Sequence, residues 1–103
     1  MIDENIFAQI KKLKTTLQSD GFIIDGIFGS YARGEHTQDS DVDILYHLES
    51  DFHKKYSGFI GFKKLDEIKT FIGKSINKKI DLAPKTNLSK TAQKYILNEV
   101  IYV

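Results

Sequence analysis

The most evident chemistry in the chain belongs to two aspartates in the segment DSDVDILY, Asp41 and Asp43. In an extended strand their side chains leave the same face, about 6.6 Å apart along the chain, while Val42 and Ile44 point to the opposite face. Two carboxylates held together repel each other and favour a nearby cation. Because the chain has no cysteine, all-oxygen ligation of this kind suits a hard ion such as Mg²⁺. An isolated Asp-x-Asp is also compatible with a solvated strand end.

A Gly-Ser pair precedes these aspartates, with ten residues between Ser30 and Asp41. Gly29 allows a ligand to approach the backbone closely. The N–H groups of a following helix start, together with the Ser30 hydroxyl, suit a phosphate. Arg33 comes one helical turn later, where it either holds a phosphate or braces the Asp41/Asp43 pair. The alternative for the Gly-Ser pair is an ordinary strand-to-helix turn with a serine cap.

A third carboxylate, Asp81, lies between Ile80 and Leu82 in the apolar segment KKIDLA. A carboxylate buried alone in a sheet is costly, so a partner or a cation is expected beside it. If this segment is the strand next to the one that carries Asp41 and Asp43, the three aspartates form one cluster. The alternative is an edge strand whose aspartate faces water.

Helical and extended segments alternate along the chain. Helices are expected where apolar residues recur at helical spacing or follow an N-cap serine. They cover residues 5–19, 59–73 and 89–100, with a short turn at 30–35. Strands are expected at short apolar runs, two of them bounded by glycine or proline, one with acidic residues at its start and one at the C-terminal end. They cover residues 22–28, 41–48, 78–83 and 101–103, and residues 49–57 are expected to form a loop or a frayed connection. Strands separated by helices predict an α/β (α+β) fold, a small mixed β-sheet flanked by helices, in a single domain over residues 1–103.

Apolar residues at helical spacing indicate the two longest helices. In the first helix they are Ile6, Ile10, Leu13 and Leu17. In the second helix they are Phe62, Leu65, Ile68, Phe71 and Ile72. In the last segments we expect a core position rather than an interface position for Tyr95, Ile96, Val100 and Tyr102. Tyr31 is expected to pack under the loop that follows it.

Length and composition exclude several classes of protein. A chain of 103 residues fits one domain, and without cysteine it is neither a disulfide scaffold nor a Cys-based zinc protein nor a cysteine-nucleophile enzyme. The formal net charge of +1 gives no case for nucleic-acid binding. No apolar run approaches the roughly 20 residues of a membrane span, and the acidic start MIDENIFAQI is unlike a secretory signal. We therefore expect a cytoplasmic domain with no membrane association and no direct nucleic-acid contact.

Taken together, the motifs resemble the nucleotidyltransferase superfamily of DNA polymerase beta. They are a Gly-Ser turn, ten intervening residues, Asp-x-Asp on an apolar strand and a later strand aspartate. Over residues 29–45, GSYARGEHTQDSDVDIL is similar to the minimal nucleotidyltransferases, whose pattern is Gly-Ser-x-Ala-Arg-Gly, a short loop and Ser-Asp-x-Asp-Leu. Ile44 stands where leucine is usual and Tyr46 where a small aliphatic residue is usual, and neither belongs to the polar set. In length and element order the resemblance covers nearly the whole chain.

The resemblance implies a nucleotidyltransferase fold and an activity. The expected reaction is Mg²⁺-dependent transfer of a nucleoside monophosphate from a nucleoside triphosphate, usually ATP, with release of pyrophosphate. It implies that Asp41 and Asp43 hold two Mg²⁺ ions, which activate the attacking oxygen and stabilise the leaving one. It also implies that Asp81 ligates the catalytic ion and accepts the proton of the acceptor hydroxyl.

The same resemblance assigns the nucleotide contacts. Gly29 and Ser30 are expected to hold the β- and γ-phosphates of ATP. Arg33 is expected to brace the site. These assignments are carried by the match of all three residues to the Gly-Ser-x-Ala-Arg-Gly pattern.

A protein partner is the last implication of the resemblance. Minimal nucleotidyltransferases are commonly encoded beside a small helical HEPN-domain protein, a ribonuclease toxin, and in that pairing can adenylylate a tyrosine of the toxin. We therefore expect a protein adenylyltransferase that serves as the antitoxin in a hetero-oligomer with a HEPN-domain toxin. One alternative is an antitoxin that neutralises its toxin by binding alone. Another is a small-molecule nucleotidyltransferase of the antibiotic-modifying kind.

Overall fold

A four-stranded mixed β-sheet forms the centre of the computed structural model, which describes residues 3–86 and 88–103. The strand order is β3 (Ile80–Pro84), β2 (Val42–Leu48), β1 (Phe22–Phe28) and β4 (Ile101–Tyr102). β1 pairs antiparallel with both β2 and β4, whereas β2 and β3 are parallel. The predicted mixed sheet is therefore confirmed, and the strands that carry Asp43 and Asp81 are neighbours.

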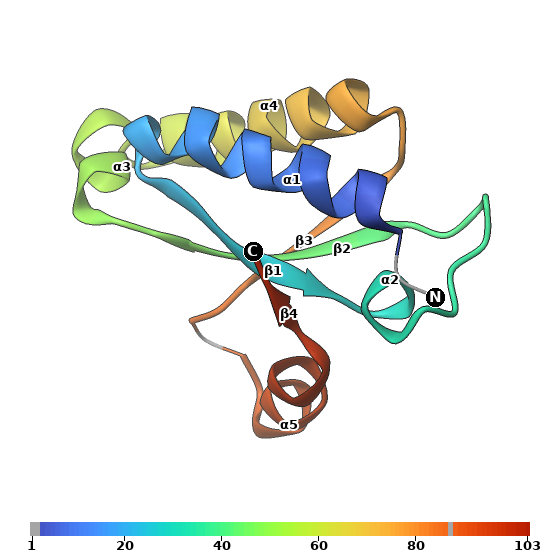
Figure 1. Cartoon of the computed structure of the whole chain (residues 1–103). Coiled ribbons are helices and arrows are strands. Elements are labelled where there is room, and N and C mark those ends of the chain that lie inside the picture. The colour runs from blue at the N-terminus through green and yellow to red at the C-terminus, as the bar shows by residue number, and fades with distance from the viewer. Residues whose placement is uncertain (1–2, 87) are drawn as a thin grey trace.

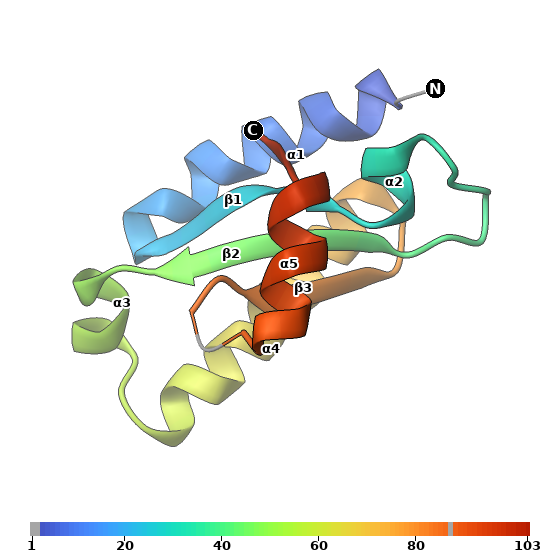
Figure 2. The same cartoon turned by 90° about the horizontal axis from the view of Figure 1, so that it is seen from below.

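Helices cover both faces of the sheet (Figure 1). α1 (Glu4–Leu17) and α4 (Phe59–Ile76) lie on one face, and α5 (Lys90–Glu99) crosses the opposite face, as the view from below shows (Figure 2). Two short helices lie at strand ends, α2 (Ser30–Arg33) after β1 and α3 (Ser50–Lys55) after β2. The expected sheet flanked by helices is thus confirmed, as three layers in which the single helix α5 forms the third layer.

The main core lies between the sheet and the helix pair α1 and α4. The predicted inner stripe of α1 is buried in full: Ile6, Ile10, Leu13 and Leu17. Asp3 caps this helix, because its carboxylate accepts the Ile6 N–H at 3.1 Å. A 3-10 turn, η1 (Gln18–Asp20), follows, and Gly21 with φ 79° turns the chain into β1. Glycine takes this left-handed conformation without steric cost.

The apolar residues at helical spacing in α4 do not all reach the core. Ile68, Ile72 and Ile76 are buried, whereas Phe62 is 74% and Phe71 is 44% exposed. Each phenylalanine directly follows or precedes a buried position of the helix and so lies about 100° around its axis. Spacing alone could not choose between two adjoining apolar faces of this helix. The helix predicted over residues 59–73 is itself confirmed, as Phe59–Ile76.

Two other expectations are corrected. Residues 49–57 are not a loop throughout, because α3 forms there and buries Phe52 against Gly21. In the C-terminal segment Tyr95 is 66% and Tyr102 is 59% exposed, and Ile96 and Val100 are only partly buried. All ten residues of α5 are described, and none of them is buried. This helix therefore has no core face of the predicted kind.

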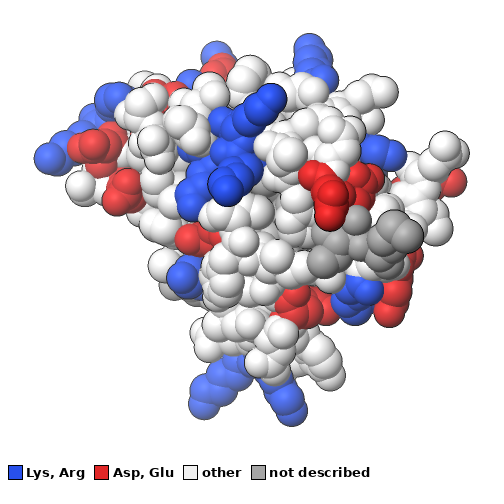
Figure 3. Space-filling view, viewed as in Figure 1, with Lys and Arg blue, Asp and Glu red and all other residues white. Residues whose placement is uncertain are grey.

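The surface carries charges of both signs. Figure 3 shows Lys and Arg side chains gathered over α1, with Asp and Glu on either side of them. That face lacks the continuous basic stripe typical of nucleic-acid binding. No helix in the described part of the chain has the length and apolar content required to cross a membrane.

Candidate active site

The turn between β1 and α2 brings the backbone of Gly29 against Asp43. Gly29 has φ 73°, a conformation that strains any residue with a side chain. A Cβ at this position would collide with the Asp43 carboxylate. Two backbone hydrogen bonds close the turn: the Arg33 N–H donates to the Gly29 carbonyl at 3.1 Å, and the Glu35 N–H donates to the Ser30 carbonyl at 2.9 Å. Glycine is required here both by the backbone and by its neighbour.

The strand pair β2–β3 positions the aspartates. Asp43 and Asp81 are direct partners in the parallel register, and Asp41 immediately precedes β2. Val42 and Ile44 are fully buried in the main core. Because side chains alternate along a strand, Asp43 faces the other side of the sheet, the side that α5 crosses. The sequence alternation at residues 41–44 therefore predicted the two faces correctly.

The negative charges of these carboxylates repel one another. The pKa of Asp43 rises from its ordinary value of 3.8 to about 6. Burial is the largest cause, followed by the negative charges of Asp81, Asp41 and Glu99, whereas the positive charge of Arg33 acts in the opposite direction. An additional positive charge at this place would stabilise the ionised form of the Asp43 carboxyl.

An open hollow of about 550 Å³ lies in front of the turn and the start of β2. Its lining joins residues far apart in the sequence: Phe28, Gly29, Ser30, Arg33, Asp39, Ser40, Asp41, Asp43 and Glu99. Five of the six predicted site residues thus line one hollow. The sixth, Asp81, is exposed and lies beside Asp43 in the sheet rather than in the lining.

The donor set fits a hard divalent cation. Within residues 3–86 and 88–103, no three His, Cys, Asp or Glu side chains already stand in the arrangement of a metal centre. The pKa of Asp43 is nevertheless raised by two neighbouring aspartates, Asp41 and Asp81. Carboxylate oxygens are the ligands that Mg²⁺ takes in proteins, and a cation here would offset their mutual repulsion. These three aspartates are the residues that would hold it.

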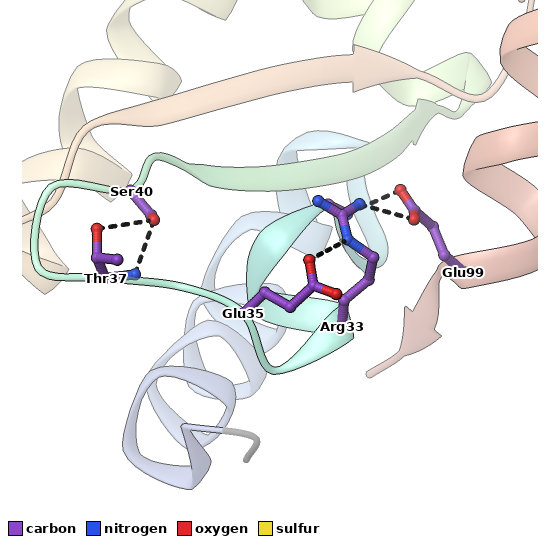
Figure 4. A network of polar contacts seen from close by, with 6 residues as sticks. Arg33, Glu35, Thr37, Ser40 and Glu99 are labelled. Atoms are coloured by element: carbon purple, nitrogen blue, oxygen red, sulfur yellow. Dashed lines mark hydrogen bonds and ion pairs between the residues drawn. The ribbon is translucent and has the colours of Figure 1, made fainter.

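Arg33 pairs with two glutamates rather than with the aspartates. Its Nη1 lies 2.9 Å from Glu99 Oε2, and its Nε lies 3.2 Å from Glu35 Oε2 (Figure 4). These two hydrogen bonds, that to Glu99 first, raise the pKa of the guanidinium above its ordinary value. The side chain thus stands at the hollow without bracing Asp41 or Asp43 by an ion pair.

The loop between the Gly-Ser turn and the Asp-x-Asp segment is held by contacts among its own residues and with Tyr31. The Thr37 N–H donates to the Ser40 hydroxyl at 2.8 Å, which fixes the loop just before Asp41 (Figure 4). Tyr31 is buried, as predicted, and His36 from the loop stacks on it with ring centroids 4.1 Å apart. Packing as well as hydrogen bonds therefore fixes the conformation of the loop between Ser30 and Asp41.

Glu99 is the site residue that sequence reasoning missed. It lies at the end of α5, and it enters the hollow beside Gly29 and Arg33. The segment around it has no motif, and its only sequence signal is an acidic residue at the end of an amphipathic helix. Nothing in that signal indicates a contact with residues about 70 positions earlier.

Comparison with known proteins agrees with this geometry. A family model described as the nucleotidyltransferase domain matches residues 10–103. The protein adenylyltransferase MntA of Thermococcus cleftensis is 37% identical over 78 residues, which are 76% of this chain and 71% of that protein.

Two solved structures share the fold. One, described as a "putative minimal nucleotidyltransferase", has a TM-score of 0.74 at 22% identity and covers 100% of this chain and 97% of that chain. The other is a chain from the crystal structure of a toxin-antitoxin with AMP-PNP; its TM-score is 0.66 at 18% identity, with 92% of this chain and 69% of that chain covered.

The mixed sheet, the Gly-Ser turn and the Asp-x-Asp strand together define an enzyme of the nucleotidyl-transfer class. The chain belongs to the nucleotidyltransferase domain family. The resemblance to the minimal nucleotidyltransferases that the sequence indicated is thereby confirmed.

Proposed function

We propose that this nucleotidyltransferase transfers AMP from ATP to a hydroxyl group of a toxin protein and acts as the antitoxin of that pair. The observation that carries the proposal is the hollow in which Gly29 and Ser30 meet Asp41 and Asp43, with Asp81 beside them in the sheet. A phosphate-binding turn next to clustered carboxylates is the arrangement that phosphoryl transfer to an oxygen nucleophile requires.

Each residue has a role that follows from its position. Asp41, Asp43 and Asp81 hold Mg²⁺, which when bound supplies positive charge to the phosphates and to the oxygens that attack and leave. The Gly29 N–H and the Ser30 hydroxyl bind oxygens of the β- and γ-phosphates, since both residues line the hollow at the turn that follows β1. The same turn orients the triphosphate relative to the start of β2.

The reaction forms one bond and breaks another. Asp81, which is exposed, accepts the proton of the acceptor hydroxyl, and the acceptor oxygen then bonds to the α-phosphorus. The bond from the α-phosphorus to the oxygen that bridges to the β-phosphate breaks, and pyrophosphate leaves. The product is an AMP ester on the acceptor, with a tyrosine hydroxyl as the expected acceptor.

The names of two similar proteins support a protein acceptor. The Thermococcus relative is a protein adenylyltransferase, and one structural neighbour is a toxin-antitoxin pair with an ATP analogue. The hollow is wide and open to solvent, so an acceptor side chain can enter from a second protein. We propose a HEPN-domain toxin as that protein, in a hetero-oligomer within the cytoplasm.

Label transfer from α-labelled ATP tests the proposal. The purified chain is incubated with Mg²⁺ and the protein encoded beside its gene, and label on that protein is measured. Asp41→Asn with Asp43→Asn should abolish the label. The matched control Asp39→Asn removes another acidic residue of the hollow and should keep it.

The possible outcomes separate three functions. Label on the neighbouring protein that depends on Asp41 and Asp43 supports adenylyl transfer. A stable complex without label would replace the proposal with an antitoxin that acts by binding alone. Neither label nor complex would contradict a toxin partner and direct the search to small-molecule acceptors.

A further inference from the structure

One carboxylate of the chain already occupies the donors of the turn. Glu99 Oε1 accepts the Gly29 N–H at 3.2 Å, and Glu99 Oε2 accepts the Arg33 Nη1–H at 2.9 Å. The two oxygens of a single side chain therefore bridge the backbone of the turn and the guanidinium of α2 (Figure 4). The Glu99 side chain is 25% exposed; its bond to the Gly29 N–H is partly buried, whereas its bond to Arg33 is exposed.

A backbone amide has one hydrogen, and it makes one good hydrogen bond. While Glu99 accepts the Gly29 N–H, a phosphate oxygen cannot take the same donor. Arg33 is less restricted, because its guanidinium has five N–H donors, but the two that are used here go to Glu99 and Glu35. A triphosphate and the Glu99 carboxylate thus compete for the same place.

The charge of Glu99 also opposes an anionic ligand. Its carboxylate faces the same hollow as Asp41 and Asp43. It is one of the groups that raise the pKa of Asp43, which shows that its field reaches the carboxylate cluster. Removal of this negative charge would favour a polyphosphate even apart from the hydrogen bond.

The element that carries Glu99 is weakly held. None of the ten residues of α5 is buried. The helix is followed by β4, which pairs with β1 through only two register positions. The chain end beyond β4 is held by the Val103 N–H, which donates to the Asp25 carbonyl at 3.1 Å, and by Lys14 Nζ, which donates to the Val103 carbonyl at 2.6 Å. At the end of α5 itself, the contact with Gly29 and Arg33 is made by the single side chain of Glu99. A side-chain rotation or a small shift of this helix end releases it without opening the main core.

We infer that Glu99 is a specificity-determining residue that occupies the phosphate subsite of the nucleotide-free protein, so that a nucleoside triphosphate binds by displacing it. The inference rests on the proposed function in one respect, the assignment of the Gly29 N–H to a phosphate oxygen. It predicts that Glu99 weakens the binding of ligands with a polyphosphate and does not affect ligands without one.

Binding of AMP-PNP with Mg²⁺, measured by calorimetry, tests this inference. Glu99→Ala should bind about tenfold more tightly than the wild type, the size expected when a charge-assisted competitor is removed. Glu99→Gln loses the charge but can still accept the Gly29 N–H, so a smaller gain is expected. Inorganic triphosphate should show the same order of affinities, and adenosine should show equal affinity throughout.

Glu35→Gln is the matched control. It removes the other carboxylate from Arg33 but frees no donor at Gly29, so its affinity for AMP-PNP should stay within about twofold of the wild type. Thermal unfolding of each variant without ligand shows whether the fold is intact. Glu99→Gln, which keeps the shape of the side chain, is the variant on which the conclusion rests if Glu99→Ala fails to fold.

Three other results would overturn the inference, and they differ in what they say about the proposed function. Weaker binding in the Glu99 variants would overturn the inference, because Glu99 would then orient Arg33 or hold the cation. Equal affinity in all variants would also overturn it and would leave the proposed function standing. Absence of AMP-PNP binding by the wild type and every variant would overturn the proposed function and this inference together.

Discussion

Asp43 and Asp81 stand opposite each other in the parallel strand pair β2–β3. Neighbouring strands lie about 4.8 Å apart, so the two side chains leave the same face of the sheet at close range. The backbone of Gly29 meets Asp43 from the other side so closely that no Cβ fits there. The fold thus builds a cluster of negative charge beside the Gly-Ser turn, and this relationship has consequences for stability as well as for the proposed activity.

Asp43→Asn should stabilise the nucleotide-free protein near pH 8 and leave it unchanged near pH 4. The pKa of Asp43 is about 6 in the folded chain and 3.8 ordinarily. The folded state therefore holds the proton more tightly, and the free energy of unfolding falls as the pH rises from about 4 to about 7. Asparagine at position 43 does not ionise, so it removes this fall in the free energy of unfolding. Since the carboxyl is partly exposed, we expect about 1 kcal/mol near pH 8.

Urea unfolding without divalent cations, at the two pH values, measures this difference. Asp39→Asn serves as the control, because Asp39 is exposed in the loop before β2 and should show no pH-dependent gain. Equal stabilisation of Asp43→Asn at both pH values would mean that charge is not the cause.

Mg²⁺ should stabilise the wild-type chain near pH 8 and have little effect on Asp43→Asn. A cation that binds only the folded state raises its stability by mass action, and here it also offsets the repulsion among Asp41, Asp43 and Asp81. We expect about 1 kcal/mol, or about 4–8 °C in Tm for a chain of this size. Thermal unfolding with MgCl₂ against NaCl of equal ionic strength measures it. The same shift in Asp43→Asn would place the cation elsewhere.

Gly29→Ala should lose nucleotide binding as well as stability, whereas Gly58→Ala should lose stability alone. Both glycines precede a helix and have positive φ, 73° and 61°. A Cβ at Gly58 has nothing within 4 Å, but one at Gly29 meets the Asp43 carboxylate. Gly58→Ala therefore measures the backbone strain, about 1–3 kcal/mol, and Gly29→Ala should cost more.

Urea unfolding and AMP-PNP titration of both variants compare the two costs. Equal stability losses, with nucleotide binding retained in both, would show that Asp43 moves aside freely. In that case the close approach at Gly29 would have no part in the site.

The sequence predicted the local parts of this molecule better than the distant ones. The alternation around Asp41 and Asp43 reports directly which side chains face the core, because the side-chain period of a strand is two. The Gly-Ser turn is equally local, since its conformation is set by the residues that form it. The position of Asp81 beside Asp43 depended on the assumption that their two strands are neighbours, which the parallel pairing of β2 and β3 confirmed.

Two features that the sequence did not predict have one physical cause, which is that tertiary contacts decide between locally equivalent choices. α4 has apolar residues around more than half of its circumference, and only packing on the sheet selects the face with Ile68 and Ile72 over that with Phe62. Glu99 entered the site through a contact with Gly29 across 70 residues. No spacing rule relates residues that meet only when α5 folds over the sheet.

Phe62→Ala and Ile72→Ala test which face of α4 packs on the sheet. Phe62 is 74% exposed and Ile72 is fully buried, although both lie in the same helix. Truncation of a buried isoleucine removes apolar contacts and leaves a cavity, so Ile72→Ala should lower the free energy of unfolding by about 2–5 kcal/mol. Phe62→Ala removes a ring that is mostly in water and should change it by less than about 1 kcal/mol. Urea unfolding of both variants at one pH measures the two values. A larger loss for Phe62→Ala would mean that α4 is turned by about 100°, so that the face with Phe62 rather than the face with Ile72 packs on the sheet.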